Sequence, residues 1–195
     1  MKIIGLCGSS GSGKSTVSAI FRELGAVILD CDQIYHDLIN RPSMCLFAIG
    51  EQFGSNVIQS GKLNRKVLRE IVFSDETARD DLNRITHAYV IAEIEILLKQ
   101  YQDQYSLCFI DAPLLFESGL DQRCDATIAV ISTLENRLER IMSRDNLSLH
   151  EAQQRIQSQL SNDELIKRCN IIIQNDNDMD ALYESCKRIF NQFTS

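Results

Sequence analysis

The stretch GSSGSGKS at residues 8–15 decides which fold this chain can adopt. It fits the pattern G-x-x-x-x-G-K-[ST] of a phosphate-binding loop. The apolar run at 2–7 before it is typical of a buried strand, and residues 17–24 after it carry apolar side chains at helical spacing. A strand, a glycine loop and a helix in this order surround a phosphate with backbone N–H groups and the positive end of a helix dipole. We therefore expect the chain to bind a nucleotide.

Each residue type in this loop suits a phosphate ligand, although a flexible Gly/Ser turn would have a similar composition. Glycines let successive N–H groups turn inward. Lys14 can reach the β- and γ-phosphates, and the hydroxyl of Ser15 can bind Mg²⁺. The residues expected to contact ATP are Gly11, Ser12, Gly13, Lys14, Ser15 and Thr16.

Composition limits the class of protein. With 195 residues, of which 44% are hydrophobic, the chain can form one good core, so we expect a single domain over 1–195. The net charge of −7 argues against a nucleic-acid partner. No apolar run predicts a membrane helix or a secretory signal. Seven scattered cysteines without a C-x-x-C pair favour reduced thiols, so we expect a cytoplasmic protein. Separately, we expect a monomer.

Apolar runs at 2–7, 26–29, 107–110, 126–131 and 171–173 alternate with helical patterns. This alternation predicts an α/β fold with a five-stranded parallel sheet covered on both faces. The second and third strands, and the fourth and fifth, are far apart in sequence, which predicts two insertions. Ligands of such sheets bind beyond the carboxyl ends of the strands, where these insertions would lie.

Two acidic positions follow predicted strands. Asp32, in the sequence Asp-Cys-Asp at 30–32, could meet Mg²⁺ or a substrate hydroxyl, or it could cap the helix expected at 34–39, and the two readings are equally supported. Asp111 ends the third strand and is in position to hold Mg²⁺, directly or through water.

Two groups of basic residues stand out. Arg65 lies with Lys66 and Arg69 at the start of a predicted helix, where a solvated helix face is the ordinary interpretation. Further along, three arginines share one face of a helix that Thr133 can cap, namely Arg137, Arg140 and Arg144. They could clamp phosphate in a lid, or they could pair with neighbours such as Glu139 and Asp145. Ser148 and Glu151 then predict a capping box that opens a second helix.

The segment 113–117, Pro-Leu-Leu-Phe-Glu, follows Asp111. Its apolar residues could be core, or they could line a pocket for an adenine or a thiol-bearing tail. Glu117 could pair with an arginine across a cleft or form a surface salt bridge. His87 lies alone on a long predicted helix at 77–100, where a histidine is more often structural.

Together these motifs resemble the dephospho-coenzyme A kinase family of P-loop kinases, over nearly the whole chain. The resemblance implies a P-loop NTPase fold similar to nucleoside monophosphate kinases, with a helical substrate insertion at about 32–100 and a helical lid at about 134–165. The motifs that carry it are the loop at 8–16, Asp-x-Asp at 30–32, the turn at 61–65, His87, the segment 113–117, the arginine helix at 137–144, and 155–159.

The resemblance implies transfer of the ATP γ-phosphate to the ribose 3′-hydroxyl of dephospho-CoA, with Mg²⁺ as cofactor. In this family the second aspartate of Asp-x-Asp orients the hydroxyl, which falls on Asp32, and a lid arginine that contacts ATP falls on Arg140. With Lys14 these form the expected catalytic set. Substrate contacts fall on Asp32, Arg65, His87, Leu114 and Glu117, an adenine contact on Asn175, and metal ligands on Ser15 and Asp111.

The chain departs from the family pattern at several points. Ala88 replaces the proline after the histidine, Cys169-Asn170 replaces Ala-Asp, and Asn177 replaces the glycine of Asn-x-Gly. Two other functions stay open: a P-loop kinase acting on a nucleoside or nucleotide, and a non-catalytic nucleotide-dependent switch. The segment 113–117 and Arg65 argue against the first, and the complete catalytic set argues against the second.

Overall fold

The computed structural model describes residues 1–176 and 178–194, so Asn177 lies outside the described residues. The chain divides into two compact units, one made of Met1–Leu29 with Tyr101–Ser195 and the other of Asp30–Gln100. Each unit is described below by itself. Within the described ranges, no helix is both long enough and apolar enough to cross a membrane.

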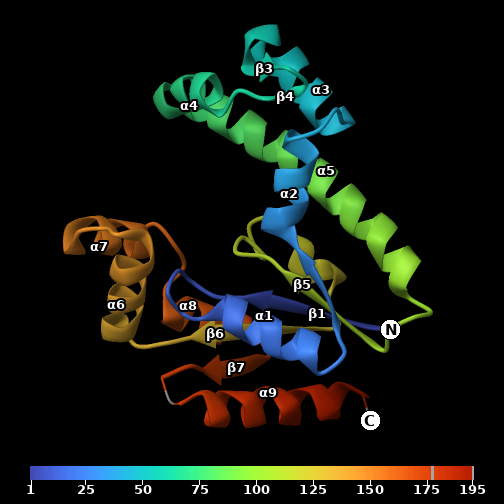
Figure 1. Cartoon of the computed structure of the whole chain (residues 1–195), viewed down its shortest axis with the longest axis vertical. Coiled ribbons are helices and arrows are strands. Elements are labelled where there is room, and N and C mark those ends of the chain that lie inside the picture. The colour runs from blue at the N-terminus through green and yellow to red at the C-terminus, as the bar shows by residue number, and fades with distance from the viewer. Residues whose placement is uncertain (177, 195) are drawn as a thin grey trace. The chain divides into compact units, whose positions relative to one another are not determined.

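The first unit is built on the five-stranded parallel sheet that the apolar runs predict, and all five strands are confirmed (Figure 1). The strands are β1 (Lys2–Cys7), β2 (Val27–Asp30), β5 (Leu107–Asp111), β6 (Ala126–Ile131) and β7 (Ile171–Gln174), in the order β2-β5-β1-β6-β7. Leu6 of the central strand lies beside Asp111 of β5 and Ile128 of β6. This register brings the phosphate loop, which follows β1, and Asp111 to the same edge of the sheet.

Side-chain alternation gives the sheet two apolar faces. On one face, Ile4 and Leu6 pack with the apolar stripes of α1 (Lys14–Glu23) and α9 (Met179–Thr194). The ring of Phe21 stacks on that of Phe109, with 4.1 Å between centroids. On the other face, Gly5 leaves room for the chain, because a Cβ there would lie 2.8 Å from the side chain of Leu115.

Helices after β6 begin at local capping signals. Thr133 accepts a hydrogen bond from the N–H of Asn136 and starts α6 (Leu134–Asp145), and the predicted capping box of Ser148 and Glu151 starts α7 (Leu149–Gln157). Both predictions are confirmed. A second capping box, from Ser161, starts α8 (Asn162–Arg168), a helix that the sequence analysis did not anticipate. A short 3₁₀ helix, η2 (Leu120–Arg123), precedes β6.

The second unit is mainly helical. Its elements are α2 (Cys31–Ile39), α3 (Met44–Phe53), η1 (Ser55–Val57), the hairpin strands β3 (Ile58–Gln59) and β4 (Lys62–Leu63), α4 (Arg65–Ser74) and α5 (Glu76–Tyr101). Buried apolar side chains on these elements include Leu46, Ile49, Val57 and Leu68. The long helix expected at 77–100 is confirmed as α5.

Candidate active site

The phosphate loop has a backbone shape that few residues other than glycine adopt. Gly11 and Gly13 have φ angles of 79° and 89°, in the left-handed region. Gly13 is the N-cap of α1 and provides no side-chain cap, and the first turn of α1 holds no acidic residue. In the described ranges the N–H groups of Lys14 and Ser15 therefore remain available to an anion, which the helix dipole also favours, while the N–H of Thr16 donates to the carbonyl oxygen of Gly13 at 3.0 Å.

Close packing is a second reason for these glycines. A Cβ at Gly11 would lie 2.6 Å from the carbonyl oxygen of Arg137, and one at Gly13 would lie 2.0 Å from Nδ2 of Asn175. The loop is thus held between α1, α6 and the segment after β7.

Lys14 and Asp111 form an ion pair at the carboxyl ends of β1 and β5. The hydroxyl of Ser18 donates a hydrogen bond to the other oxygen of Asp111. Asp111 is only 3% exposed, so these two partners offset the cost of burying its charge. Ser15 is exposed in the first turn of α1. Its hydroxyl and the Asp111 carboxylate are hard oxygen donors of the type that Mg²⁺ prefers, so these residues fit the metal that the family implies.

Arg140 is bound to the back of the phosphate loop. Its Nη1 donates to the carbonyl oxygen of Gly11 at 3.1 Å and to the hydroxyl of Ser132 at 3.2 Å, and its Nη2 donates to the carbonyl oxygen of Asn175 at 2.9 Å. Asn175 is also buried, and its Nδ2 donates to the carbonyl oxygen of Ser12 at 2.8 Å. Both residues therefore stabilise the loop, while their direct contacts with ATP stay predictions.

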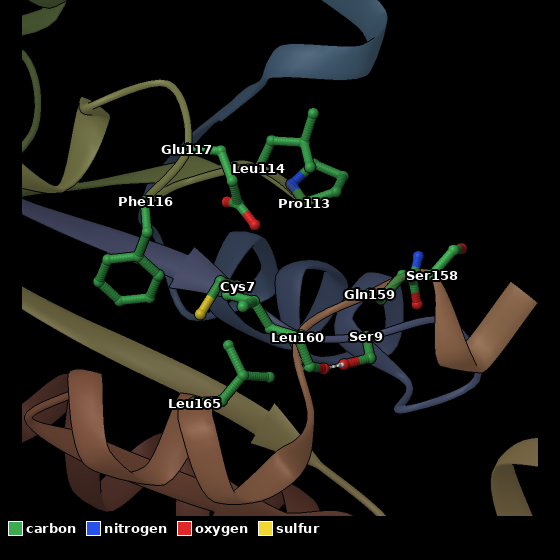
Figure 2. Close-up of a pocket in the computed structure, with 11 residues that line it drawn as sticks. Cys7, Ser9, Pro113, Leu114, Phe116, Glu117, Ser158, Gln159, Leu160 and Leu165 are labelled. Atoms are coloured by element: carbon green, nitrogen blue, oxygen red, sulfur yellow. Dashed lines mark hydrogen bonds between the residues drawn. The ribbon is translucent and has the colours of Figure 1, made fainter.

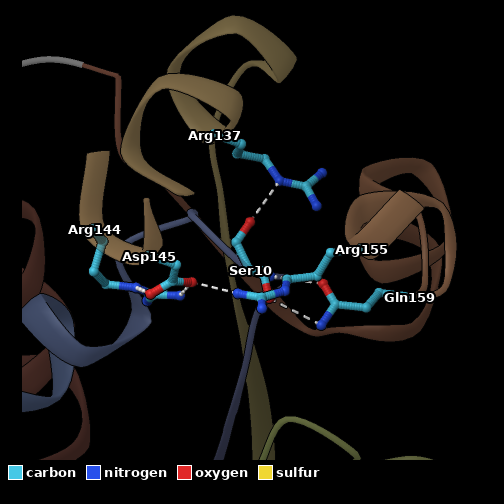
Figure 3. Close-up of polar contacts among 6 residues, drawn as sticks. All are labelled: Ser10, Arg137, Arg144, Asp145, Arg155 and Gln159. Carbon is cyan, nitrogen blue, oxygen red and sulfur yellow. Dashed lines mark hydrogen bonds and ion pairs between the residues drawn. The ribbon is translucent and has the colours of Figure 1, made fainter. Parts of the chain in front are cut away.

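Arg137 makes a further contact with the loop that sequence reasoning missed. Its side chain is buried, and Nε donates to the carbonyl oxygen of Ser10 at 3.0 Å (Figure 3). Burial lowers the pKa of this guanidinium. Its Nη1 lies 3.5 Å from Oδ1 of Asn162, and Nδ2 of Asn162 donates to the carbonyl oxygen of Ser132 at 2.9 Å. Gln159 completes the set by accepting a hydrogen bond from the N–H of Ser10 at 2.8 Å.

Arg144 has a different environment. Its side chain is 61% exposed and makes two hydrogen bonds of 2.8 Å to Asp145, which also pairs with Arg155 (Figure 3). Hydrogen bonds from Arg144 and then Arg155 lower the pKa of Asp145 to about 2. Arg144 therefore pairs with Asp145, as the alternative to a phosphate clamp predicted, whereas Arg137 and Arg140 bind the phosphate loop.

Asp176 is another residue that sequence reasoning missed. Its carboxylate accepts hydrogen bonds from the Ser132 hydroxyl at 2.6 Å, the Thr133 N–H at 2.8 Å and the Asn136 side chain at 2.9 Å. Burial alone would raise the pKa of this carboxyl, but these donors, with Gln174, hold it well below its usual range. Its position directly after a strand end was the one available signal.

The segment 113–117 borders a small pocket beside the loop (Figure 2). Leu114 is 49% exposed and lines the pocket with Glu117, whereas Leu115 is fully buried and belongs to the core. The cavity of about 60 Å³ holds a few water molecules and not a nucleotide. In the described part of the chain Glu117 makes no ion pair, so the surface salt bridge considered for it is not formed.

The remaining predicted site residues belong to the 30–100 unit. Asp30, and not Asp32, caps α2, because its carboxylate accepts a hydrogen bond from the N–H of Gln33 at 3.0 Å. Asp32 lies in the first turn of α2, so its interpretation as the cap is wrong. Arg65 is exposed at the start of α4, and His87 is half-buried on α5. The substrate roles of Asp32, Arg65 and His87 stay predictions.

Comparison with known proteins agrees with this geometry. The family model described as Dephospho-CoA kinase matches residues 2–181. A dephospho-CoA kinase from Fusobacterium nucleatum is 38% identical over 187 residues, which cover 95% of each chain.

Solved structures give the same result. A dephospho-CoA kinase from Campylobacter jejuni superposes with a TM-score of 0.72 at 30% identity, covering 100% of this chain and 98% of that one. The protein TT1252 from Thermus thermophilus superposes with a TM-score of 0.84 at 30% identity, with the same coverage. The chain therefore belongs to the dephospho-CoA kinase family of ATP-dependent phosphotransferases.

Proposed function

We propose that the chain transfers the γ-phosphate of ATP to the ribose 3′-hydroxyl of dephospho-CoA, with Mg²⁺ as cofactor. The observation that carries this proposal is the uncapped start of α1 beside the Lys14–Asp111 pair. Phosphoryl transfer needs positioning and charge neutralisation more than covalent chemistry. A helix N-terminus with unused N–H groups next to one ammonium group supplies both for the phosphates of a nucleotide.

The loop residues have distinct tasks in this proposal. The backbone of Gly11, Ser12 and Gly13 cradles the phosphates, with Thr16 next to them, and Lys14 neutralises charge that develops on the transferred group. Ser15 and Asp111 supply oxygen ligands for Mg²⁺, which when bound would offset the phosphate charge. Because Asp111 holds the Lys14 ammonium at the end of the sheet, that cation is in place before the nucleotide arrives.

In this proposal Arg140 both stabilises the phosphate loop and takes part in catalysis. A guanidinium has five N–H donors, and Arg140 uses Nη1 to bind the loop at Gly11 and Nη2 to bind Asn175. We assign it also to the phosphates of ATP, and Asn175 to the adenine side. Its fixed geometry means that little further ordering is needed in the transition state.

The 30–100 unit is proposed to bind dephospho-CoA. Asp32 orients the 3′-hydroxyl, while Arg65 and His87 contact the anionic and polar parts of the substrate. Leu114 and Glu117 contribute from the pocket beside the loop. The segment 134–165 is proposed as a lid that excludes water, which would otherwise hydrolyse ATP without transfer. We further propose a monomer in the cytoplasm, where the seven free thiols described would stay reduced.

The test is ADP release from Mg·ATP with dephospho-CoA, compared with nucleosides, nucleotides and pantothenate derivatives. A high rate with dephospho-CoA alone, and a product phosphorylated at the 3′ position, would support the proposal. Activity on a nucleotide instead would show that this nucleotide, and not dephospho-CoA, is the substrate. ATP binding without turnover would favour a nucleotide-dependent switch.

The role of Asp32 has its own test. Asp32→Asn should lower kcat at least about a hundredfold, since it removes the group that orients the hydroxyl. Asp37→Asn is the matched control, because Asp37 lies on the same helix and its polar contacts within the described ranges are with Gln33 and His36. Near-normal kcat in Asp32→Asn would disprove the assignment and make Asp111 the rival.

A further inference from the structure

Two thiols from distant parts of the chain meet next to the phosphate loop. The Sγ atoms of Cys7 and Cys169 lie 3.5 Å apart, although 162 positions separate the residues. Cys7 ends β1 directly before Gly8, and Cys169 caps the end of α8, with Asn170 between it and β7. Neither thiol has a task in the phosphoryl transfer proposed above, and both are unbridged.

The two thiols differ in exposure and in pKa, which favours a reaction in which one of them attacks before the other. Cys7 is 1% exposed, and its Sγ also lies 3.6 Å from the carbonyl oxygen of Ile128, whereas Cys169 is half-buried. The hydrogen bond between the two thiols lowers the pKa of Cys169, and the same bond with burial raises the pKa of Cys7. Cys169 is thus both the thiol that solvent reaches and the one that more readily becomes a thiolate.

We propose that Cys7 and Cys169 are a redox pair that closes to an intramolecular disulfide when it meets a small-molecule disulfide, RSSR. The Cys169 thiolate attacks one sulfur of RSSR, so that the mixed disulfide Cys169–S–S–R forms and RS⁻ leaves. Cys7 then loses its proton and attacks the sulfur of Cys169, which expels the second RS⁻. In total, two protein thiols lose two electrons and two protons, and RSSR is reduced to two RSH.

Closure of this bond should disturb the phosphate loop. A disulfide requires about 2.05 Å between sulfurs, so the two must approach by more than 1 Å from their present contact. Cys7 pairs with Ala129 in the sheet, so we expect the approach to displace Cys169 and, with it, the end of α8 that it caps. That helix carries Asn162, which binds Arg137, and Leu165, which lines the pocket with Cys7 (Figure 2).

The experiment exposes the full-length chain to oxidised glutathione and then maps disulfides by mass spectrometry without reduction. We expect a peptide that links Cys7 to Cys169, with the loss of two hydrogens. Phosphate transfer should fall about tenfold and return on reduction, since a shift of this size misplaces the loop. Only this second readout rests on the proposed function, so its failure alone would leave the disulfide standing.

Matched variants make the outcome decisive. Cys169→Ala should prevent both the link and the loss of turnover, while Cys124→Ala, which removes another half-buried thiol of the same unit, should change neither. The thermal midpoint of each variant checks that it is folded. A glutathione adduct that stays on Cys169, a link between other cysteines, or seven unmodified thiols would each overturn the proposal.

Discussion

Charged side chains have different environments around the phosphate loop and in the 30–100 unit. Around the loop, side chains from α6, from the segment after α7 and from the segment after β7 hold the backbone at Ser10, Gly11 and Ser12. In the 30–100 unit, Arg65 is exposed, and within the described ranges it makes neither an ion pair nor a hydrogen bond through its side chain. Its basic neighbours Lys66 and Arg69 are exposed as well.

This difference indicates where the free energy of binding would act: on the transition state near the loop, and on substrate affinity in the 30–100 unit. A loop that is already ordered loses little conformational entropy when a nucleotide binds, so its contacts can act on the transition state. An exposed arginine without an acidic partner gains most when an anion arrives. We therefore expect changes near the loop to affect turnover, and changes at Arg65 to affect substrate affinity.

The largest effect is expected from Arg140. Arg140→Ala should lower kcat about a hundredfold, about 2.7 kcal/mol, because the carbonyl groups of Gly11 and Asn175 lose their donor and the phosphates lose a cation. Arg144→Ala, on the same helix, should stay within about threefold, since the side chain of Arg144 is largely exposed and its polar contacts in the described part of the chain are with Asp145. Steady-state kinetics of both variants measure this, and equal losses would contradict the distinction between them.

A second prediction concerns the shape of the loop. Gly13 and Gly25 both have φ near 90–104°, so alanine should cost each about 1 kcal/mol of backbone strain. Only at Gly13 would the new Cβ also collide with Asn175, whereas nothing lies within 4 Å at Gly25. Gly13→Ala should therefore lower the free energy of unfolding by about 2 kcal/mol or more, and Gly25→Ala by about 1. Urea unfolding gives both values, and similar losses would show that the close approach does not matter.

A substitution in the 30–100 unit should have a smaller effect, and on KM instead of kcat. Arg65→Ala should raise KM for dephospho-CoA about tenfold and leave KM for ATP unchanged, because one charge-assisted contact is lost. Arg79→Ala is the matched control, since Arg79 is exposed in the same unit but already pairs with Glu76. A fall in kcat without a change in KM would show that Arg65 affects turnover as the loop residues do, and would contradict the expected difference between the two regions.

The smallest effect should appear on acidification. Because the pKa of Asp176 is held below its usual range, its hydrogen bonds stabilise the fold fully above about pH 4 and are lost as pH falls further. The native chain should therefore lose stability below about pH 4, and Asp176→Asn should show a shallower dependence because it does not titrate. Asp103→Asn, in an exposed turn, should follow the native curve. Urea midpoints over this pH range test it, and parallel curves for the native chain and Asp176→Asn would contradict it.

Much of the architecture could be predicted because its signals are local. The strands come from apolar runs, and helix starts come from Thr133 and the box at Ser148, where one side chain bonds an N–H three residues on. The same rule failed at Asp32, because Asp30 is also a capping residue and only the backbone conformation decides between them. The second capping box, at Ser161, has the same local signal but was not predicted.

By itself, then, the sequence determined the phosphate loop, the order of strands along the chain and the family, since each depends on residues adjacent in the chain or on motifs that recur in relatives. Tertiary packing determines the contacts of Arg137 and Arg140 with the phosphate loop, the donors around Asp176 and the contact between Cys7 and Cys169. Those contacts join segments more than a hundred residues apart or on different elements. Their partners are set by how helices pack on the sheet, which no local pattern encodes.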